Sequence, residues 1–107
     1  MVNIEEFKKL DIRVGKIVSV EDFLEARKPM YKLKIDFGEF TKFSAAAIKP
    51  FYEKEELLNT RVIAIVNLEP RKIANFVSEC LTLGAELNEK FVLLRPDKDI
   101  EIGAKIF

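Results

Sequence analysis

The segment from residue 61 to residue 84, RVIAIVNLEPRKIANFVSECLTLG, restricts the fold most strongly, because it places two apolar stretches around a short polar connection. Residues 62–66 are all apolar and mostly β-branched, which predicts a strand buried on both faces. Pro70 cannot donate a backbone hydrogen bond, so the strand ends before it, and residues 77–83 predict a second strand. These strands would hold the connection rigidly, as is common for loops that bind ligands.

Alternation along the second predicted strand places Glu79 on a face of bulky residues, whereas the opposite face carries small ones. A carboxylate buried there without a partner would be costly. One interpretation is that Glu79 is exposed at the strand end or forms an ion pair with Arg71 or Lys72. The other is that Glu79, Ser78 and Asn67 join the two basic residues in a recognition site.

The length of 107 residues predicts one domain, 1–107. A hydrophobic content of 49% and a charged content of 34% are typical of a soluble globular protein, and no apolar run is long enough to cross a bilayer. Residues 1–10, MVNIEEFKKL, lack the basic start and the apolar centre of a signal peptide. We therefore expect a cytoplasmic protein with no membrane insertion.

The sequence has no histidine and one cysteine, which excludes Ser-His and Cys-His nucleophile pairs, histidine metal ligands and an internal disulfide. We expect a binding protein rather than an enzyme, with no cofactor and no metal. Cys80 is predicted to be a small buried hydrophobic residue. Eighteen basic residues balance eighteen acidic ones, so any contact with nucleic acid would depend on a local basic patch.

The rest of the chain reads as short strands. The predicted elements are a short amphipathic helix at residues 3–10, strands at 11–21, 30–37 and 40–48, a connector with a short helical stretch at 49–59, a turn at 86–90, a strand at 91–94 and a strand-like extension at 100–107. Gly15 predicts a bend in the first strand. The small residues 44–47 either pack in a tight core or let a ligand approach closely. The pattern predicts an all-β fold, a five-stranded OB-fold barrel with a short N-terminal helix and a C-terminal strand extension.

The terminal segments hold more apolar side chains than a small barrel can enclose. Pairing the extensions of two copies about a two-fold axis would bury these side chains and cover strand edges. We therefore predict a homodimer. The expected interface residues are Ile4, Phe7, Phe91, Leu93, Ile100, Ile102, Ile106 and Phe107.

Three stretches, DIRVGKIVSVEDFLEARKPMYKLKIDFG, NLEPRKIANFVSECLTLGA and LLRPD followed by GAKI, resemble the tRNA-binding domain family. Its members include domains attached to aminoacyl-tRNA synthetases, free-standing tRNA-binding proteins and the CsaA export-related chaperones. Residues 23–27 (FLEAR) and 79–81 (ECL) depart from the synthetase type and favour the CsaA type. Residues 44–47 (SAAA) stand where CsaA members usually have Ser-Ser-Ala-Gln.

The resemblance implies an OB-fold, a homodimer built with the terminal extensions and a ligand surface around the loop before the last barrel strand. Asn67, Pro70, Arg71 and Lys72 match the family's Asn-x-x-Pro-Arg-Lys/Arg segment, and Ser78 matches the serine that follows it. The alternative for Arg71 and Lys72 is a solvated turn. The candidate residues for binding a peptide or tRNA are Asn67, Pro70, Arg71, Lys72, Ile73, Phe76, Ser78, Glu79, Arg27 and Lys28.

Our leading hypothesis from the sequence is a CsaA-like chaperone that binds unfolded or export-destined precursor polypeptides as a homodimer. The alternative is a tRNA-binding protein, or a module acting in trans with an aminoacyl-tRNA synthetase.

Overall fold

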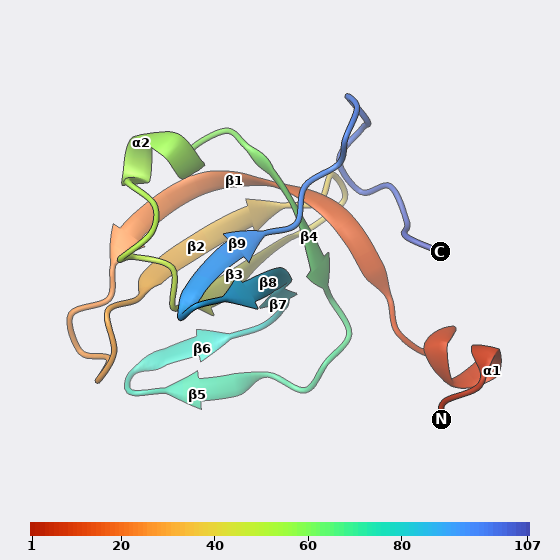
Figure 1. Cartoon of the computed structure of the whole chain (residues 1–107), viewed down its shortest axis with the longest axis horizontal. Helices are drawn as coiled ribbons and strands as arrows, with labels where there is room; N and C mark the ends of the chain where they lie inside the picture. Colours follow the sequence, from red (N-terminus) through yellow and green to blue (C-terminus); the bar gives the residue numbers. More distant parts are fainter.

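A computed structural model describes residues 1–107, and its largest element is a five-stranded antiparallel sheet in the order β3-β2-β1-β4-β7 that curls into a nearly closed barrel (Figure 1). Two further pairs, β5 with β6 and β8 with β9, form two-stranded sheets. The elements are α1 (Ile4–Phe7), β1 (Ile12–Asp22), β2 (Tyr31–Asp36), β3 (Thr41–Ala46), α2 (Lys54–Leu57), β4 (Arg61–Ile65), β5 (Arg71–Ile73), β6 (Phe76–Ser78), β7 (Leu81–Thr82), β8 (Gly84–Leu87) and β9 (Lys90–Leu93). The predicted all-β OB-fold barrel with a short N-terminal helix is confirmed.

Strand β1 is long enough to pair with two different strands of the barrel. Its first half pairs with β4 and its second half pairs with β2, and Lys16 takes part in both ladders. The register shifts between Ile17 and Ser19, so the irregularity lies beyond the predicted position at Gly15. Gly15 is required for a different reason: a Cβ there would overlap the side chains of Ile35 and Phe37. The missing side chain therefore lets β2 pack closely across the core.

The core is formed mainly by the inward side chains of β1, β2 and β4, joined by side chains from the segments beside them. The largest fully buried ones include Phe37, Ile17, Leu33, Ile35 and Val62. Along β4 burial alternates strictly, so the prediction of a strand buried on both faces is wrong. The chain covers only the inner face of β4 and leaves the outer face partly exposed.

The second predicted strand of the central segment is broken. Residues 77–83 contribute to β6 and β7, and Glu79 and Cys80 lie between them. The preceding connection is itself a strand, β5, which forms a hairpin with β6 through Ala74 and Asn75. Ala74 has a φ of 53°, which suits the first central residue of such a tight turn. The ligand loop expected from the sequence is therefore a projecting β-hairpin.

The terminal segments flank β1. Helix α1 is capped by Asn3, whose side chain accepts a hydrogen bond from the N–H of Glu6. The segment after β9 forms no regular strand, but the N–H of Val14 donates to the carbonyl of Ala104 at 2.9 Å, and the N–H of Ile106 donates to the carbonyl of Ile12 at 2.8 Å. The predicted C-terminal strand is therefore an irregular extension held along β1. None of the helices is long and apolar enough to span a membrane.

Candidate functional site

The barrel closes between β3 and the β6–β7 segment without a regular ladder, and we call this junction the seam. The N–H of Glu79 donates to the carbonyl of Phe43 at 2.8 Å. The N–H of Ala45 donates to Ser78 Oγ, and the hydroxyls of Ser44 and Thr82 are 3.0 Å apart. Side-chain oxygens thus replace a backbone ladder. The small residues 44–47 allow this approach, which favours the core interpretation of that run.

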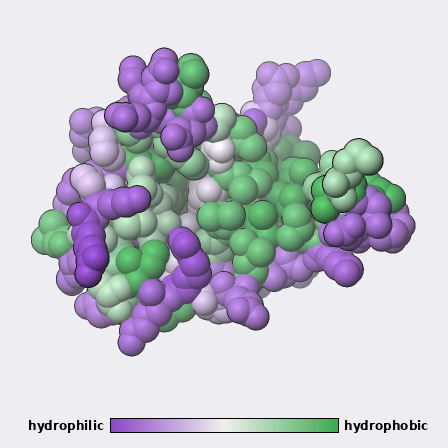
Figure 2. All heavy atoms as spheres, turned by 60° about the horizontal axis from the view of Figure 1, so that its bottom comes forward, coloured by the Kyte–Doolittle hydropathy of each residue, from purple (hydrophilic) through white to green (hydrophobic).

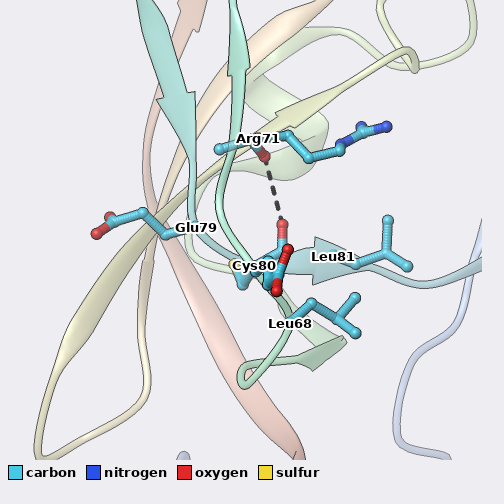
Figure 3. Close-up of a pocket in the computed structure, with 7 residues that line it drawn as sticks. Leu68, Arg71, Glu79, Cys80 and Leu81 are labelled. Carbon is cyan, nitrogen blue, oxygen red and sulfur yellow. Dashed lines mark hydrogen bonds between the residues drawn. The ribbon is translucent and has the colours of Figure 1, made fainter.

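Glu79 takes part in the seam. Its Oε1 accepts a hydrogen bond from the N–H of Phe43 at 3.0 Å, and the structure contains no ion pair between Glu79 and Arg71 or Lys72. In Figure 3 its side chain points away from Arg71. The ion-pair interpretation is therefore wrong, because this carboxylate is held by a backbone N–H of β3.

Ser78 and Cys80 face the interior. Ser78 Oγ donates to the carbonyl of Cys80 at 3.4 Å, the dashed line in Figure 3, in addition to accepting from Ala45. Burial raises the pKa of the Cys80 thiol to about 12, so the thiol stays protonated near neutral pH and is a poor nucleophile. The predicted burial of Cys80 is confirmed. No group of three acidic or thiol side chains is placed to hold a metal ion.

Asn67 connects the end of β4 with the segment after α1. Its Oδ1 accepts from the N–H of Asp11 at 2.8 Å, and its Nδ2 donates to the carbonyl of Lys9 at 2.8 Å. Both polar groups of this side chain are therefore engaged within the chain. The geometry gives Asn67 a positioning role for the residues that follow it.

A small pocket, which we call the hairpin pocket, lies at the start of β5 and has a volume of about 180 Å³. Its lining residues are Leu68, Glu69, Arg71, Ser78, Glu79, Cys80 and Leu81. Leu68 and Leu81 lie on the same side of it in Figure 3, and both are exposed. Pro70, Arg71 and Lys72 are exposed as well. This pocket can take an apolar side chain next to a guanidinium group.

The other end of the hairpin lies near the loop between β1 and β2. Ile73 and Ala74 share a hollow of about 460 Å³ with the loop residues from Glu25 to Lys28 and with Met30, and we call it the loop hollow. Arg27 and Lys28 are exposed. The fold therefore brings Arg27 and Lys28 next to Ile73, whereas Arg71 lines the hairpin pocket.

Beside the hairpin, the outer surface of β1, β2 and β3 carries an aromatic groove of about 380 Å³, lined by Val18, Ser19, Glu21, Lys32, Lys34, Phe43 and Phe76. The Phe76 ring packs edge-to-face against Phe23 and Phe43, with centroids 5.4 and 5.8 Å apart. Lys32 Nζ lies 5.0 Å from the centroid of Phe23 and 5.5 Å from that of Phe76. Of these residues only Phe76 belonged to the predicted site. The polar face of the predicted strand at 30–37 could have identified both lysines.

A second apolar surface covers the outer side of β4 and β7, and we call it the apolar face. Its members are Ile63, Ile65, Leu68, Leu81, Leu83, Val92 and Leu94, all partly or well exposed. Figure 2 shows a broad apolar area between the hairpin region and α1.

The residues expected at a dimer interface fall into two groups. Ile4, Phe7, Ile100 and Phe107 are exposed, and Ile102 and Ile106 are partly exposed. Leu93 is buried in the core of the chain, and Phe91 packs against that core. Phe91 stays partly exposed, as Ile102 and Ile106 do, whereas the buried Leu93 is not available to a partner within this fold.

Comparison with known proteins places this geometry in a family. A family model described as "Putative tRNA binding domain" matches residues 12–105. The crystal structure of the CsaA chaperone from Picrophilus torridus is 50% identical, covers 100% of both chains and superposes with a TM-score of 0.94. CsaA from Bacillus anthracis is 41% identical over 100% of this chain and 99% of that one, also with a TM-score of 0.94.

Curated relatives include longer enzymes. Methionine–tRNA ligase from Pyrococcus furiosus is 44% identical over 105 residues, which is 98% of this chain but 14% of that protein. A solved structure of a MetRS-related protein from Pyrococcus horikoshii is 27% identical, with a TM-score of 0.90 and coverage of 100% of this chain and 98% of that one. The family match over most of the chain and these relatives show that the chain belongs to the tRNA-binding domain family.

Proposed function

We propose that this protein is a cytoplasmic, CsaA-like chaperone that binds unfolded or export-destined polypeptides without catalysing a reaction. The observation that carries the proposal is the hairpin pocket, where Leu68 and Leu81 are exposed next to Arg71. Exposed apolar side chains beside a basic group can bind the apolar segments that an unfolded polypeptide exposes and a folded protein buries. The 50% identity to a CsaA chaperone over the whole length of both chains supports this assignment.

The proposed chaperone acts as a homodimer through the members of the apolar face that do not line the hairpin pocket, which are Ile63, Ile65, Leu83, Val92 and Leu94. Ile63, Ile65 and Leu83 point outward from the barrel and are partly exposed. Both terminal segments also carry exposed apolar side chains. A second copy would cover these side chains through the same patch on each subunit. Ile65→Glu should therefore give monomers in light scattering, whereas Lys34→Glu, a change in the aromatic groove, should not. A monomeric wild type at micromolar concentration would contradict the dimer.

Binding of tRNA is the second candidate, and the aromatic groove favours it. Phe43 and Phe76 offer ring faces and edges to unstacked bases, while Lys32 and Lys34 lie beside them. Single-stranded nucleic acids are commonly held by such a combination of stacking and positive charge. The methionine–tRNA ligases among the relatives support this alternative.

A titration at two salt concentrations separates the candidates. The ligands are bulk tRNA and reduced, carboxymethylated lactalbumin, a permanently unfolded polypeptide. Affinity for tRNA should fall by several orders of magnitude between about 50 and about 200 mM salt if many phosphates are neutralised, because each one releases counterions. Affinity for the polypeptide should change much less. Tight tRNA binding with no measurable polypeptide binding would overturn the proposed function.

Paired variants locate each site. Arg71→Ala with Lys72→Ala should weaken polypeptide binding and leave the fold intact, because exposed charges contribute about 0–1 kcal/mol to stability. Lys32→Ala with Lys34→Ala is the matched control for the aromatic groove and should weaken tRNA binding more than polypeptide binding. If the variant with Arg71→Ala and Lys72→Ala bound both ligands as tightly as the wild type, Arg71 and Lys72 would have no role in binding and would only be solvated residues.

A further inference from the structure

The outer edge of β5 is unpaired. Strand β5 pairs with β6 on one side, and no strand of the chain pairs with it on the other. Figure 1 shows β5 at the rim of the molecule, with nothing beyond it. Its backbone groups on that side are consequently available to another chain.

The register identifies these groups. Ile73 and Phe76 flank a turn of two residues and are opposite each other, so they form the hydrogen-bonded pair next to the turn. Lys72 and Val77 are the next pair, in which the N–H and C=O groups point away from the partner strand. The bond from the N–H of Glu79 to β3 agrees with this parity, since Glu79 and Val77 present their backbone to the same side. The N–H and C=O of Lys72 therefore point to the free edge.

Two features decide which chain can occupy this edge. Pro70 lies two residues before Lys72 on the same edge and has no N–H, so only its carbonyl is available. A second copy pairing β5 against β5 would place Arg71 and Lys72 near their own copies, and like charges on adjacent strands repel. An extended chain with neutral or acidic side chains meets no such repulsion.

Both ends of the edge have room for side chains. The hairpin pocket includes Arg71 in its lining, and the loop hollow includes Ile73. A strand laid along β5 would therefore run from one cavity to the other, with its alternate side chains on one face of the hairpin. Main-chain hydrogen bonds would give affinity independent of sequence, while the cavities would select apolar residues.

We propose that client polypeptides bind as an added antiparallel strand on the free edge of β5, with Lys72 exchanging two backbone hydrogen bonds with one client residue and Pro70 accepting a third. This inference rests on the proposed polypeptide-binding function and names its mode. This mode would let one small domain bind many different unfolded sequences, because every client offers the same backbone.

The protein variant that tests the mode is Lys72→Pro, which removes the outward N–H but no bond to β6. Its matched control is Lys72→Ala, which removes the same charge and keeps the N–H. With carboxymethylated lactalbumin as the probe, we expect Lys72→Pro to bind roughly tenfold more weakly than Lys72→Ala, as the loss of about one net hydrogen bond implies. Equal affinities for the two variants, with thermal melting showing both folded, would overturn the mode.

A peptide series tests the same mode without altering the protein. The probe is a synthetic decapeptide of alternating valine and glutamate, N-methylated either on every valine or on every glutamate, so that each version lacks the N–H groups of one edge. One version should lose at least tenfold in affinity and the other should bind like the unmethylated peptide. Equal binding of both would overturn the added strand while leaving the proposed function in place. Failure of the wild type to bind any of the unfolded probes would overturn both.

Discussion

The two sides of the barrel are held together by different kinds of bond. Where β1 meets β2, a ladder of backbone pairs runs from Lys16 to Asp22 over a fully buried apolar core. At the seam, β3 is joined to the β6–β7 segment by a backbone bond between Glu79 and Phe43 and mainly by side chains, chiefly those of Ser44, Ser78, Glu79 and Thr82. The hairpin that carries the proposed site is attached on the seam side. Binding elements are commonly drawn from the less stable parts of a fold, and we expect the seam to open more readily than the ladder side.

The largest expected effect is on the ladder side. Leu33 lies on β2 and is fully buried, so Leu33→Ala leaves a cavity in the core. We expect the free energy of unfolding to fall by about 2–5 kcal/mol. Urea denaturation followed by circular dichroism measures this, and a loss of less than about 1 kcal/mol would contradict the packing of this core.

The seam should respond less, and in a non-additive way. Thr82→Val leaves the buried Ser44 hydroxyl without its partner, which should cost about 1–3 kcal/mol. The double variant Ser44→Ala with Thr82→Val removes both polar groups and should recover most of that loss. Additive losses in the double-mutant cycle would show that the two hydroxyls do not interact.

Glu79 offers a milder test of the seam. Glu79→Ala removes the acceptor for the N–H of Phe43 and should cost about 1 kcal/mol, because the side chain is partly exposed. Glu79→Gln keeps an oxygen acceptor and should lose less. An equal loss for the two variants would mean that the bond to Phe43 contributes nothing to closure.

The smallest expected effect on stability comes from raising the pH at Cys80, whose thiol can also be followed by chemical labelling. Its pKa in the folded state, about 12, lies above the value of about 8.5 for an unfolded thiol. Stability from the protonated thiol is thus fully present below the unfolded pKa and is lost as the pH rises from there through the folded pKa. At pH 8 the thiol should react with a disulfide reagent only after the protein unfolds. Rapid labelling of folded protein would show that the seam opens.

The sequence was sufficient to predict the ladder side. The strand at 30–37 alternates in hydropathy because one of its faces lies in the core, and the structure has β2 there. The apolar run at 62–66 also predicts a strand, and the structure has β4 there. The outer face of β4 is partly exposed because no other part of the chain covers it. The fold class followed from the number and spacing of such segments.

The seam could not be predicted in the same way. Alternation correctly separated the bulky from the small residues of 77–83, but the small side is the buried one: Ser78, Cys80 and Thr82 are each 6% exposed, whereas Val77 is 47% exposed. The reason is the close approach of β3, a partner distant in sequence. The same tertiary contact engages Glu79 and breaks the predicted strand. Of the predicted site residues, Asn67, Ser78 and Glu79 make hydrogen bonds within the chain that the sequence pattern does not reveal.

Asn67 has a practical consequence for anyone who purifies or fuses this protein. The Asn67 side chain binds the backbone of Lys9 and Asp11, just before β1. The next residue, Leu68, lines the hairpin pocket, so the N-terminal segment is attached close to the proposed site. We expect an affinity tag or a fluorescent partner joined before α1 to disturb this attachment. Ligand affinities are therefore best compared on protein that carries no added group ahead of this attachment.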